Sequence, residues 1–260
     1  MKTTAGNILE LRACGINFGG LTAVSALEVG IGRHDLLGMI GPNGAGKTTV
    51  FNMITGVYQP TKGSVLFDGR NIVGLKPYQI AGLGIGRTFQ NIRLFPSLTV
   101  YENIQVSFVK TLRHGFSHST LQLPRFHEEE RAVRASIVEL LEIFNLTQVM
   151  NERATSLPYG DQRRTEIVRA LATRPQLLLL DEPAAGMNAT EKVELMRLIR
   201  LVKERFDIAI LLIEHDMKVV MGICERIIVL DYGIKIAEGS PEAIRNNPSV
   251  IEAYLGEQAA

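Results

Sequence analysis

A glycine-rich loop between a predicted strand and a predicted helix constrains this chain more than any other feature. It runs from Gly41 to Thr49 and fits the pattern G-x-x-x-x-G-K-[ST]. The run His34–Ile40 before it predicts a buried strand, and Lys47–Thr55 after it predicts a helix that ends at Gly56. Strand, glycine loop and helix together are the context in which this pattern forms a phosphate cradle.

The residue types of the loop suit an anion. Its glycines let backbone N–H groups converge because no Cβ stands in the way, and the helix N-terminus adds partial positive charge. Lys47 would reach the β- and γ-phosphates of a nucleotide, and the Thr48 hydroxyl would ligate Mg²⁺. A glycine turn with a chance Lys-Thr is the alternative, which the flanking elements disfavour. The residues expected at the phosphates are Gly41, Pro42, Asn43, Gly44, Ala45, Gly46, Lys47, Thr48 and Thr49.

A second feature is an apolar strand that ends in two carboxylates. Leu177–Leu180 predicts a fully buried central strand, and Asp181 and Glu182 follow at its carboxyl end, where open α/β sheets bind ligands. Because consecutive strand residues point to opposite sides, we expect the two acids to differ in role. Asp181 can hold Mg²⁺ through water, and Glu182 can polarise an attacking water.

Three other positions could face the same ligand, although each also has an ordinary structural interpretation. Gln90 would end the predicted strand Ile85–Gln90, near the loop if that strand neighbours the one before the loop. His215 follows the buried run Ile208–Ile213 and could contact a γ-phosphate or lie on the surface. Phe18 could stack on a nucleobase or pack in the core.

The stretch Leu157–Gln162 is interrupted by Pro158 and Gly160, and a helix is predicted over Asp161–Thr173. The helix would begin at a glycine, so its N-terminus is either a second anion site or an ordinary helix start.

The N-terminal residues predict two strands, Ile8–Phe18 and Thr22–Val29. Alternation in the first should place Leu9, Leu11 and Ala13 on one face.

Residues 91–156 have the pattern of helices and predict a helical subdomain inserted into the sheet domain. Thr99–Glu102 is a capping box, and Glu128–Leu146 predicts an amphipathic helix. The polar segment Arg113–Glu130 predicts a solvated loop. It contains three histidines, which would bind a metal only if they converged, namely His114, His118 and His127.

The composition of the chain limits the kinds of partner and the compartment that we expect. A formal net charge of +1 gives no reason to expect nucleic acid, and Cys14 and Cys224 lie far apart in apolar stretches, which favours buried thiols over a disulfide. No secretory signal is visible, and the longest apolar runs are too short to cross a bilayer. We therefore expect a soluble, cytoplasmic protein, and any membrane role must come through a partner.

The ordered motifs resemble those of an ABC-type ATPase subunit over nearly the whole chain. The matching stretches are Gly41–Thr49, Gln90, Leu157–Gln162, Leu177–Glu182, Ala184–Asn188 and His215. The resemblance implies an α/β fold, with a P-loop NTPase (RecA-like) core, an antiparallel β subdomain and an inserted α-helical subdomain. It implies one ABC ATPase domain over 1–260, with the nucleotide-binding core and β subdomain at 1–90 and 176–240, the helical subdomain at 91–175 and a C-terminal helical extension at 241–260.

In this family two subunits clamp ATP head to tail, between the phosphate loop of one and the Leu157–Gln162 stretch of the other. The resemblance implies Phe18 on adenine, Asp181 and Gln90 on Mg²⁺, and Glu182 as general base. It further implies Gln90 as γ-phosphate sensor with His215 as its partner, and Gly160 and Asp161 on the nucleotide across the dimer.

Two departures from the family pattern affect the clamp. Pro158 stands where the family usually has a serine, which removes a hydroxyl and an N–H, and Asn188 stands where the family usually has an aspartate. An amide can still form hydrogen bonds but cannot accept as a charge.

Longer stretches resemble the LivG-type ATP-binding subunit of branched-chain amino-acid importers. They are Arg87–Phe95, Tyr159–Arg164, Asp181–Asn188, Ile213–Met221 and Ile244–Leu255. The resemblance implies a second ATP-binding subunit (homo- or heterodimer), membrane permease subunits, indirectly a substrate-binding protein, and a place on the inner face of the plasma membrane. A permease helix would dock on apolar residues that could instead be core, namely Phe89, Leu94, Phe95, Leu98, Val100 and Tyr101.

Other functions are open at this point. An ATPase of a lipid or lipopolysaccharide export system would share the fold and much of the motif set. A member that remodels nucleic acid or ribosomes would bring two cassettes, a long coiled coil or a basic patch, and a small-molecule kinase would not account for Leu157–Gln162.

Overall fold

The computed structural model describes residues 6–108 and 124–258 of the chain, except for the side chains of 124–127 and 255–258. The chain forms two compact units, one of residues 1–87 and 176–260 and one of residues 88–175. The second unit is thus an insertion in the sequence of the first. The predicted limits of a helical subdomain at 91–175 and of an extension at 241–260 remain predictions.

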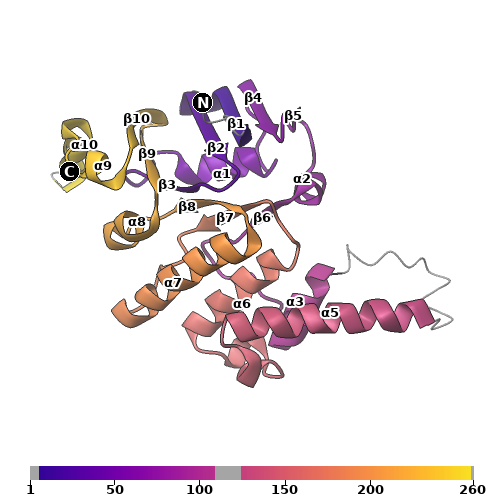
Figure 1. The fold of residues 1–260 in the computed structure, drawn as a ribbon. Helices are drawn as coiled ribbons and strands as arrows, with labels where there is room; N and C mark the ends of the chain where they lie inside the picture. The colour runs from indigo at the N-terminus through magenta and orange to yellow at the C-terminus, as the bar shows by residue number, and fades with distance from the viewer. Residues whose placement is uncertain (1–5, 109–123, 259–260) are drawn as a thin grey trace, which may run out of the picture. The chain divides into compact units, whose positions relative to one another are not determined.

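The first unit contains a six-stranded sheet in the order β10-β9-β3-β8-β7-β6 (Figure 1). Neighbouring strands from β9 to β6 are parallel, and β10 pairs antiparallel with β9. Every residue of β3, β7 and β8 is buried, which a parallel sheet requires when both faces are covered. The strands are β3 (Leu36–Ile40), β6 (Ile85–Arg87), β7 (Leu177–Asp181), β8 (Ala209–Ile213), β9 (Arg226–Asp231) and β10 (Ile234–Gly239).

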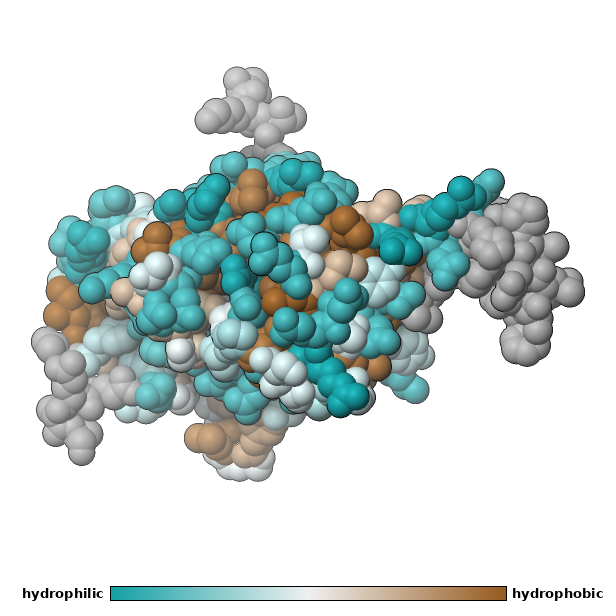
Figure 2. All heavy atoms as spheres, turned by 90° about the horizontal axis from the view of Figure 1, so that it is seen from below, coloured by the Kyte–Doolittle hydropathy of each residue, from teal (hydrophilic) through white to brown (hydrophobic). Residues whose placement is uncertain are grey.

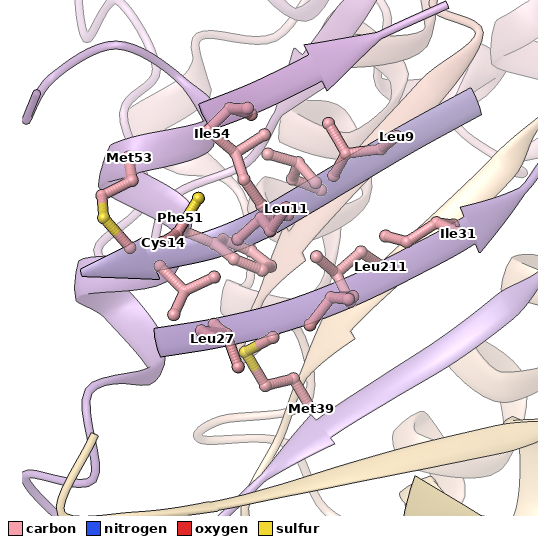
Figure 3. Close-up of a cluster of buried hydrophobic side chains, with 14 of the residues drawn as sticks. Leu9, Leu11, Cys14, Leu27, Ile31, Met39, Phe51, Met53, Ile54 and Leu211 are labelled. Carbon is pink, nitrogen blue, oxygen red and sulfur yellow. The ribbon is translucent and has the colours of Figure 1, made fainter. Parts of the chain in front are cut away.

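Helices cover both faces of this sheet. Met39 of β3 and Leu211 of β8 share a buried cluster with Phe51 of the helix after the loop (Figure 3). Full burial of a side chain such as Phe51 stabilises the fold by about 1.5–3 kcal/mol. The helix after the loop is α1 (Lys47–Ile54), and the helices on the opposite face are α7 (Ala189–Phe206) and α8 (Met217–Ile223) (Figure 1).

A four-stranded antiparallel sheet in the order β2-β1-β4-β5 packs on the other side of α1. The predicted shared face of Leu9, Leu11 and Ala13 is wrong for Ala13, which is exposed with a φ of 46°. The register of β1 with both of its neighbours shifts there, and the resulting bulge turns Cys14 into the core instead. The strands are β1 (Asn7–Phe18), β2 (Leu21–Gly32), β4 (Lys62–Phe67) and β5 (Arg70–Asn71).

Local signals set the ends of the other elements of the first unit. The Ser240 hydroxyl accepts a hydrogen bond from the Ala243 N–H (3.3 Å) and so caps the helix that begins at Pro241. β9 and β10 pair antiparallel as a hairpin. The remaining helices are α2 (Pro77–Leu83), α9 (Pro241–Arg245) and α10 (Pro248–Gln258).

The predicted strand Ile85–Gln90 is too long. β6 ends at Arg87 and pairs with β7, so the condition set for Gln90, that its strand neighbours the one before the phosphate loop, is not met. After Arg87 the backbone no longer pairs with a strand. The Phe89 N–H instead donates a hydrogen bond to the Glu166 side chain (3.3 Å), which belongs to a helix of the same, second unit.

The described part of the second unit is helical. The Thr99 capping box is confirmed, because the Glu102 N–H donates to the Thr99 hydroxyl (3.2 Å) and the Thr99 N–H donates to the Glu102 carboxylate (2.8 Å). The helices are α3 (Val100–Phe108), α5 (Pro124–Ile143) and α6 (Tyr159–Leu171), with 3₁₀ turns at Thr147–Val149 and Ala154–Ser156.

α5 begins earlier than the sequence pattern indicated. The predicted amphipathic helix is present, with Ile137 and Leu141 fully buried, but the loop predicted over Arg113–Glu130 is wrong from Pro124 onward. A proline in the first turn is a helix-start signal, and charged helix formers follow it. His127 therefore lies within the helix, and His114 and His118 fall outside the described residues.

The face drawn in Figure 2 is mostly hydrophilic, with apolar residues in separate spots. None of the helices in the described part of the chain is long and apolar enough to cross a membrane.

Both cysteines are buried free thiols, as predicted. The Cys14 thiol donates to the Ser64 carbonyl (3.0 Å), and burial raises its pKa. Burial, together with the charges of Glu214 and Glu225, raises the pKa of Cys224 to about 12. Neither thiol is accessible or ionised near neutral pH.

We expect both thiols of the folded protein to be inert toward a chromogenic disulfide at about pH 8, because burial removes both access and thiolate. Raising the pH through the ordinary thiol pKa near 8.5 should leave the slow reaction almost unchanged. Denaturant should release both Cys14 and Cys224 to rapid titration, which is the internal control. A thiol that reacts rapidly in the native protein would contradict the buried placement.

Candidate functional site

The glycine loop connects β3 to α1, as predicted. Gly41, Gly44 and Gly46 have φ angles of 151°, 78° and 98°, which residues with a Cβ rarely adopt. Inside the loop the Ala45 N–H donates to the Pro42 carbonyl (3.2 Å) and closes a turn. The strand–loop–helix prediction is confirmed.

Two neighbouring strands pack directly against the loop backbone. A Cβ on Gly41 would lie 2.0 Å from the Leu230 carbonyl oxygen, and one on Gly46 would lie 2.7 Å from the Ala23 carbonyl oxygen. Both glycines are therefore required for close approach as well as for their backbone angles.

The turn between β9 and β10 holds the loop from a third side. The Gly233 N–H donates to the Ala45 carbonyl (3.1 Å), and the Gly233 carbonyl accepts from the Ser25 N–H (2.9 Å). Asn43 and Gly44 are exposed on the outer side, where the loop borders a hollow of about 510 Å³. The loop is thus fixed by its neighbours on one side and open on the other.

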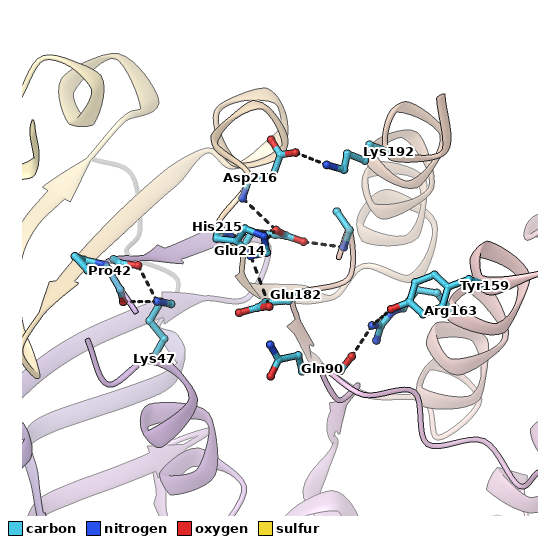
Figure 4. Close-up of polar contacts among 12 residues, drawn as sticks. Pro42, Lys47, Gln90, Tyr159, Arg163, Glu182, Lys192, Glu214, His215 and Asp216 are labelled. Atoms are coloured by element: carbon cyan, nitrogen blue, oxygen red, sulfur yellow. Dashed lines mark hydrogen bonds and ion pairs between the residues drawn. The ribbon is translucent and has the colours of Figure 1, made fainter. Parts of the chain in front are cut away.

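Lys47 begins α1 and is largely buried. Its ammonium donates to the carbonyls of Gly41 (2.7 Å) and Pro42 (2.8 Å), so the charge is held over the loop (Figure 4). In the described residues no side chain caps α1, whose N-cap residue is Gly46. The first-turn N–H groups and the ammonium together form a positive concavity. Thr48 is exposed and Thr49 half-buried beside it.

Asp181 ends β7 and is buried in an ion pair. The Arg87 guanidinium, at the end of β6, donates to Asp181 Oδ2 (2.9 Å) and also to Asn52 (2.8 Å) and Thr55 (3.2 Å) of the α1 segment. The orientation of this carboxylate is therefore fixed by protein groups.

Glu182 leaves the sheet in a left-handed conformation, with a φ of 46°. Strand alternation is the ground for expecting Asp181 and Glu182 to differ in role, and it does not apply to Glu182, whose backbone is not extended. The difference in role stays a prediction. Its N–H donates to the Ile213 carbonyl (2.9 Å), which holds the strained residue in place. A strained acid at the end of a central strand is typical of a functional position.

His215 lies beside Glu182. Its Nδ1 is 3.6 Å from a Glu182 carboxylate oxygen, and its side chain is 60% exposed (Figure 4). His215 therefore lies on the surface, which is one of the two alternatives. Because Glu182 lies beside it, contact with a γ-phosphate stays a prediction.

Glu214, between β8 and His215, is fully buried and binds two loops. Its carboxylate accepts hydrogen bonds from the N–H groups of Ala184 (2.7 Å), His215 (3.1 Å) and Asp216 (3.3 Å) (Figure 4). Burial raises the pKa of Glu214, and these N–H donors oppose the rise. One carboxylate therefore connects the segment after Glu182 to the segment that carries His215.

The hydrogen bonds around Glu214 connect through Asp216 to α7. Asp216 caps α8 and forms an ion pair with Lys192 (2.7 Å), whose hydrogen bond lowers the pKa of Asp216, and Asp216 in turn raises the pKa of Lys192. Asn188 caps α7 by accepting from the Glu191 N–H (3.0 Å), so its amide oxygen already has a local partner.

Phe18 lies at the end of β1 with 43% of its surface exposed. Its ring meets that of Tyr58 edge to face, with centroids 5.1 Å apart. The core alternative for Phe18 is therefore wrong, and an exposed aromatic pair is available for stacking.

Three predicted site residues lie in the second unit. Gln90 is exposed, with its backbone carbonyl bound by Arg163 (2.7 Å) (Figure 4). α6 begins at Tyr159, so Gly160 and Asp161 occupy its first turn rather than its start, and Asp161 pairs with Arg164. Pro158 is the N-cap residue and provides no side-chain cap.

The structure thus places the loop, Asp181, Glu182 and His215 along the carboxyl edge of one sheet, since β3, β8 and β7 are parallel neighbours. Their chemical roles remain predictions. Sequence reasoning missed five residues that support the predicted ones, namely Tyr58, Arg87, Arg163, Glu166 and Glu214. A charged residue at or just after the end of a buried strand was the available signal for Arg87 and Glu214.

Comparison with known proteins identifies the family. Residues 24–185 match the family described as ABC transporter, and residues 235–260 match that described as branched-chain amino acid ATP-binding cassette transporter. The chain is 47% identical over 250 residues to the high-affinity branched-chain amino acid transport ATP-binding protein BraF of Pseudomonas aeruginosa, covering 96% of this chain and 98% of that protein. It is 46% identical over 250 residues to LivG of Escherichia coli K12, with the same coverage. The chain belongs to the ABC transporter family.

Solved ABC transporter structures share the fold. The ADP conformation of an ATP-binding cassette matches with a TM-score of 0.82 and 28% identity, over 96% of this chain and 99% of that one. A dimeric post-hydrolysis cassette bound to ADP and phosphate matches with a TM-score of 0.75 and 26% identity, over 90% of this chain and 98% of that one.

Several predictions are thereby confirmed. The fold is that of an ABC ATPase, the chain is an ATP-binding subunit that hydrolyses ATP, and its relatives are those of the branched-chain amino-acid group.

We expect Glu214→Gln to lower kcat for ATP by roughly 10- to 100-fold while KM changes little, because an amide cannot accept from all three N–H groups and the Glu182 and His215 segments lose their alignment. Steady-state ATPase measurements at saturating and limiting ATP give this split. Glu204→Gln, an exposed glutamate on α7, is the matched control and should behave as wild type. An unchanged kcat for Glu214→Gln would show that Glu214 serves packing alone.

Proposed function

We propose that this chain hydrolyses ATP to drive the import of branched-chain amino acids through a membrane permease. The observation that carries the proposal is the likeness of almost the whole chain to BraF and LivG, together with the separate match of residues 235–260. The cargo rests on that likeness, since an ATP-binding subunit drives transport without holding the amino acid.

Each residue of the site has a proposed role. Lys47 and the loop N–H groups would hold the phosphates, and Glu182 would take a proton from the attacking water. His215 would orient the γ-phosphate beside Glu182. The distance of 3.6 Å between His215 Nδ1 and a Glu182 carboxylate oxygen supports that role. Phe18 would stack on adenine, and the edge-to-face contact with Tyr58 supports its ring.

Magnesium fits the donors present. Thr48, Asp181 and Gln90 offer hydroxyl, carboxylate and amide oxygens, which are hard ligands of the kind Mg²⁺ prefers. Arg87 already fixes one oxygen of Asp181, so this ligand would need little rearrangement. Bound Mg²⁺ would neutralise charge on the β- and γ-phosphates.

A second ATP-binding subunit would complete each ATP site. Gly160 and Asp161, in the first turn of α6, would approach the nucleotide held by the partner subunit's loop, and the dimeric structure of a relative supports this arrangement. The partner would be an identical chain or a related ATPase. Permease subunits would anchor the pair to the cytoplasmic face of the plasma membrane, with a substrate-binding protein beyond them and no nucleic acid.

A lipid or lipopolysaccharide export ATPase is the alternative function. It would share the loop, the acids and the fold. The match of residues 235–260 to the branched-chain amino-acid group favours the importer.

We expect Lys47→Ala and Glu182→Gln to fail differently. Lys47→Ala removes the cation over the loop and should weaken ATP binding, whereas Glu182→Gln keeps the loop and should bind ATP while kcat falls by about 10²- to 10⁴-fold. Binding of a fluorescent ATP analogue and steady-state hydrolysis separate the two effects, with Glu204→Gln as control. Hydrolysis at the parental rate by Glu182→Gln would remove the general-base assignment.

The cargo can be tested in native membranes. The chain should co-purify with permease subunits, and vesicles that contain the purified complex and its substrate-binding protein should take up leucine, isoleucine and valine when ATP is supplied. Glu182→Gln complexes should bind the same partners without uptake, which controls for assembly. Active hydrolysis with lipid translocation and no amino-acid uptake would favour the export alternative.

A further inference from the structure

A buried ion pair in the second unit is not used by any role assigned so far. Arg163 and Glu166 of α6 are 0% and 1% exposed in their side chains, and their charged atoms lie 2.8 Å apart. Burial raises the pKa of Glu166, while the Arg163 charge opposes the rise. Apolar residues often stabilise such a position as well as a buried ion pair does, so the pair calls for another explanation.

The pair binds the backbone of residues 88–99, which we call the strap. Arg163 donates to the carbonyl of Gln90 (2.7 Å) (Figure 4) and to that of Phe89 (2.6 Å). Glu166 accepts from the N–H groups of Phe89 (3.3 Å) and Arg93 (3.2 Å). The cation meets carbonyls and the anion meets N–H groups, so each charge is placed for the backbone group it serves.

The same arginine reaches the first turn of α6. Its Nη2 donates to the Tyr159 hydroxyl (3.0 Å), next to Gly160 and Asp161. Further along the strap, the buried amide of Asn103 accepts from the Phe95 N–H (2.8 Å) and donates to the Phe95 carbonyl (3.2 Å). The strap is thus fixed to α6 at residue 90 and to α3 at residue 95.

We propose that Arg163 and Glu166 are positioning residues that make residue 90 and the first turn of α6 move as one body. The proposal rests on the proposed function, in which Gln90 is a ligand of Mg²⁺ in the chain's own ATP site and Gly160 approaches the ATP of the partner subunit. The Arg163–Glu166 pair, which we call the clamp in this subsection, then transmits ATP occupancy of one site to the other. Neither side chain touches nucleotide.

The geometry separates a clamp from a simple ion pair. An ion pair needs only two opposite charges, whereas this clamp needs the guanidinium fork toward carbonyls and the carboxylate toward N–H groups. Lysine has a single ammonium and cannot serve the Phe89, Gln90 and Tyr159 oxygens together with Glu166.

The test measures the ATP dependence of hydrolysis by the full transport complex. Arg163→Lys and Glu166→Gln should lose cooperativity between ATP sites and lower kcat roughly tenfold, with binding of a fluorescent ATP analogue little changed. Arg174→Lys, an exposed arginine just beyond α6, and Glu142→Gln, an exposed glutamate of α5, make the same substitutions away from the strap and should match wild type. Thermal melts confirm that each variant is folded.

Two further variants keep the test decisive. Tyr159→Phe removes the hydroxyl that accepts a hydrogen bond from Arg163 and should lower the cooperativity of hydrolysis partly. This variant tests the proposal if Arg163→Lys does not fold. The charge-reversed double variant Arg163→Glu with Glu166→Arg keeps an ion pair but opposes every backbone group, so it should not restore cooperativity.

The outcomes distinguish the two proposals. Wild-type complex without cooperative hydrolysis would contradict the shared ATP sites of the proposed function. Cooperative wild type with unchanged Arg163→Lys, or restored activity in the charge-reversed variant, would overturn the clamp alone.

Discussion

Parallel pairing of β7 with β8, and of β8 with β3, is the constraint on which the candidate site depends. The register sets Asp181 of β7 and Met39 of β3 level with the same residue, Ile213 of β8. The chain leaves all three strands at one edge, so Glu182, Glu214 and the glycine loop emerge side by side. Because helices cover both faces of the sheet and every residue of these strands is buried, polar side chains can meet solvent at the ends of the strands and not on the faces of the sheet.

Buried carboxylates, rather than sheet hydrogen bonds, bind the backbone of two segments that lie outside the strands. Glu214 in the first unit and Glu166 in the second each accept backbone N–H groups from a segment without regular structure. A buried N–H left without an acceptor costs about 1–3 kcal/mol, so each acid stabilises one arrangement of its segment over the alternatives. In this chain, two irregular segments are thus fixed by buried carboxylates in place of strand pairing.

Short-range patterns explain what could be predicted from sequence. The glycine loop and the leucine strand depend on neighbours within a few positions, and both formed as expected. Glu214 meets Ala184 from 30 positions away, and Arg163 meets Phe89 from 74 positions away, so no local pattern announces either contact. The bulge at Ala13 and the left-handed backbone of Glu182 arise from pairing with distant strands, which alternation along a single strand does not report.

Arg87 has a consequence for interpreting natural variants of this chain. One guanidinium reaches Asn52, Thr55 and Asp181 and also lies 5.5 Å from the Phe51 ring centre. A lysine allele would conserve charge yet lack the planar fork that spans helix and strand, so a substitution score based on charge would class a disruptive change as mild.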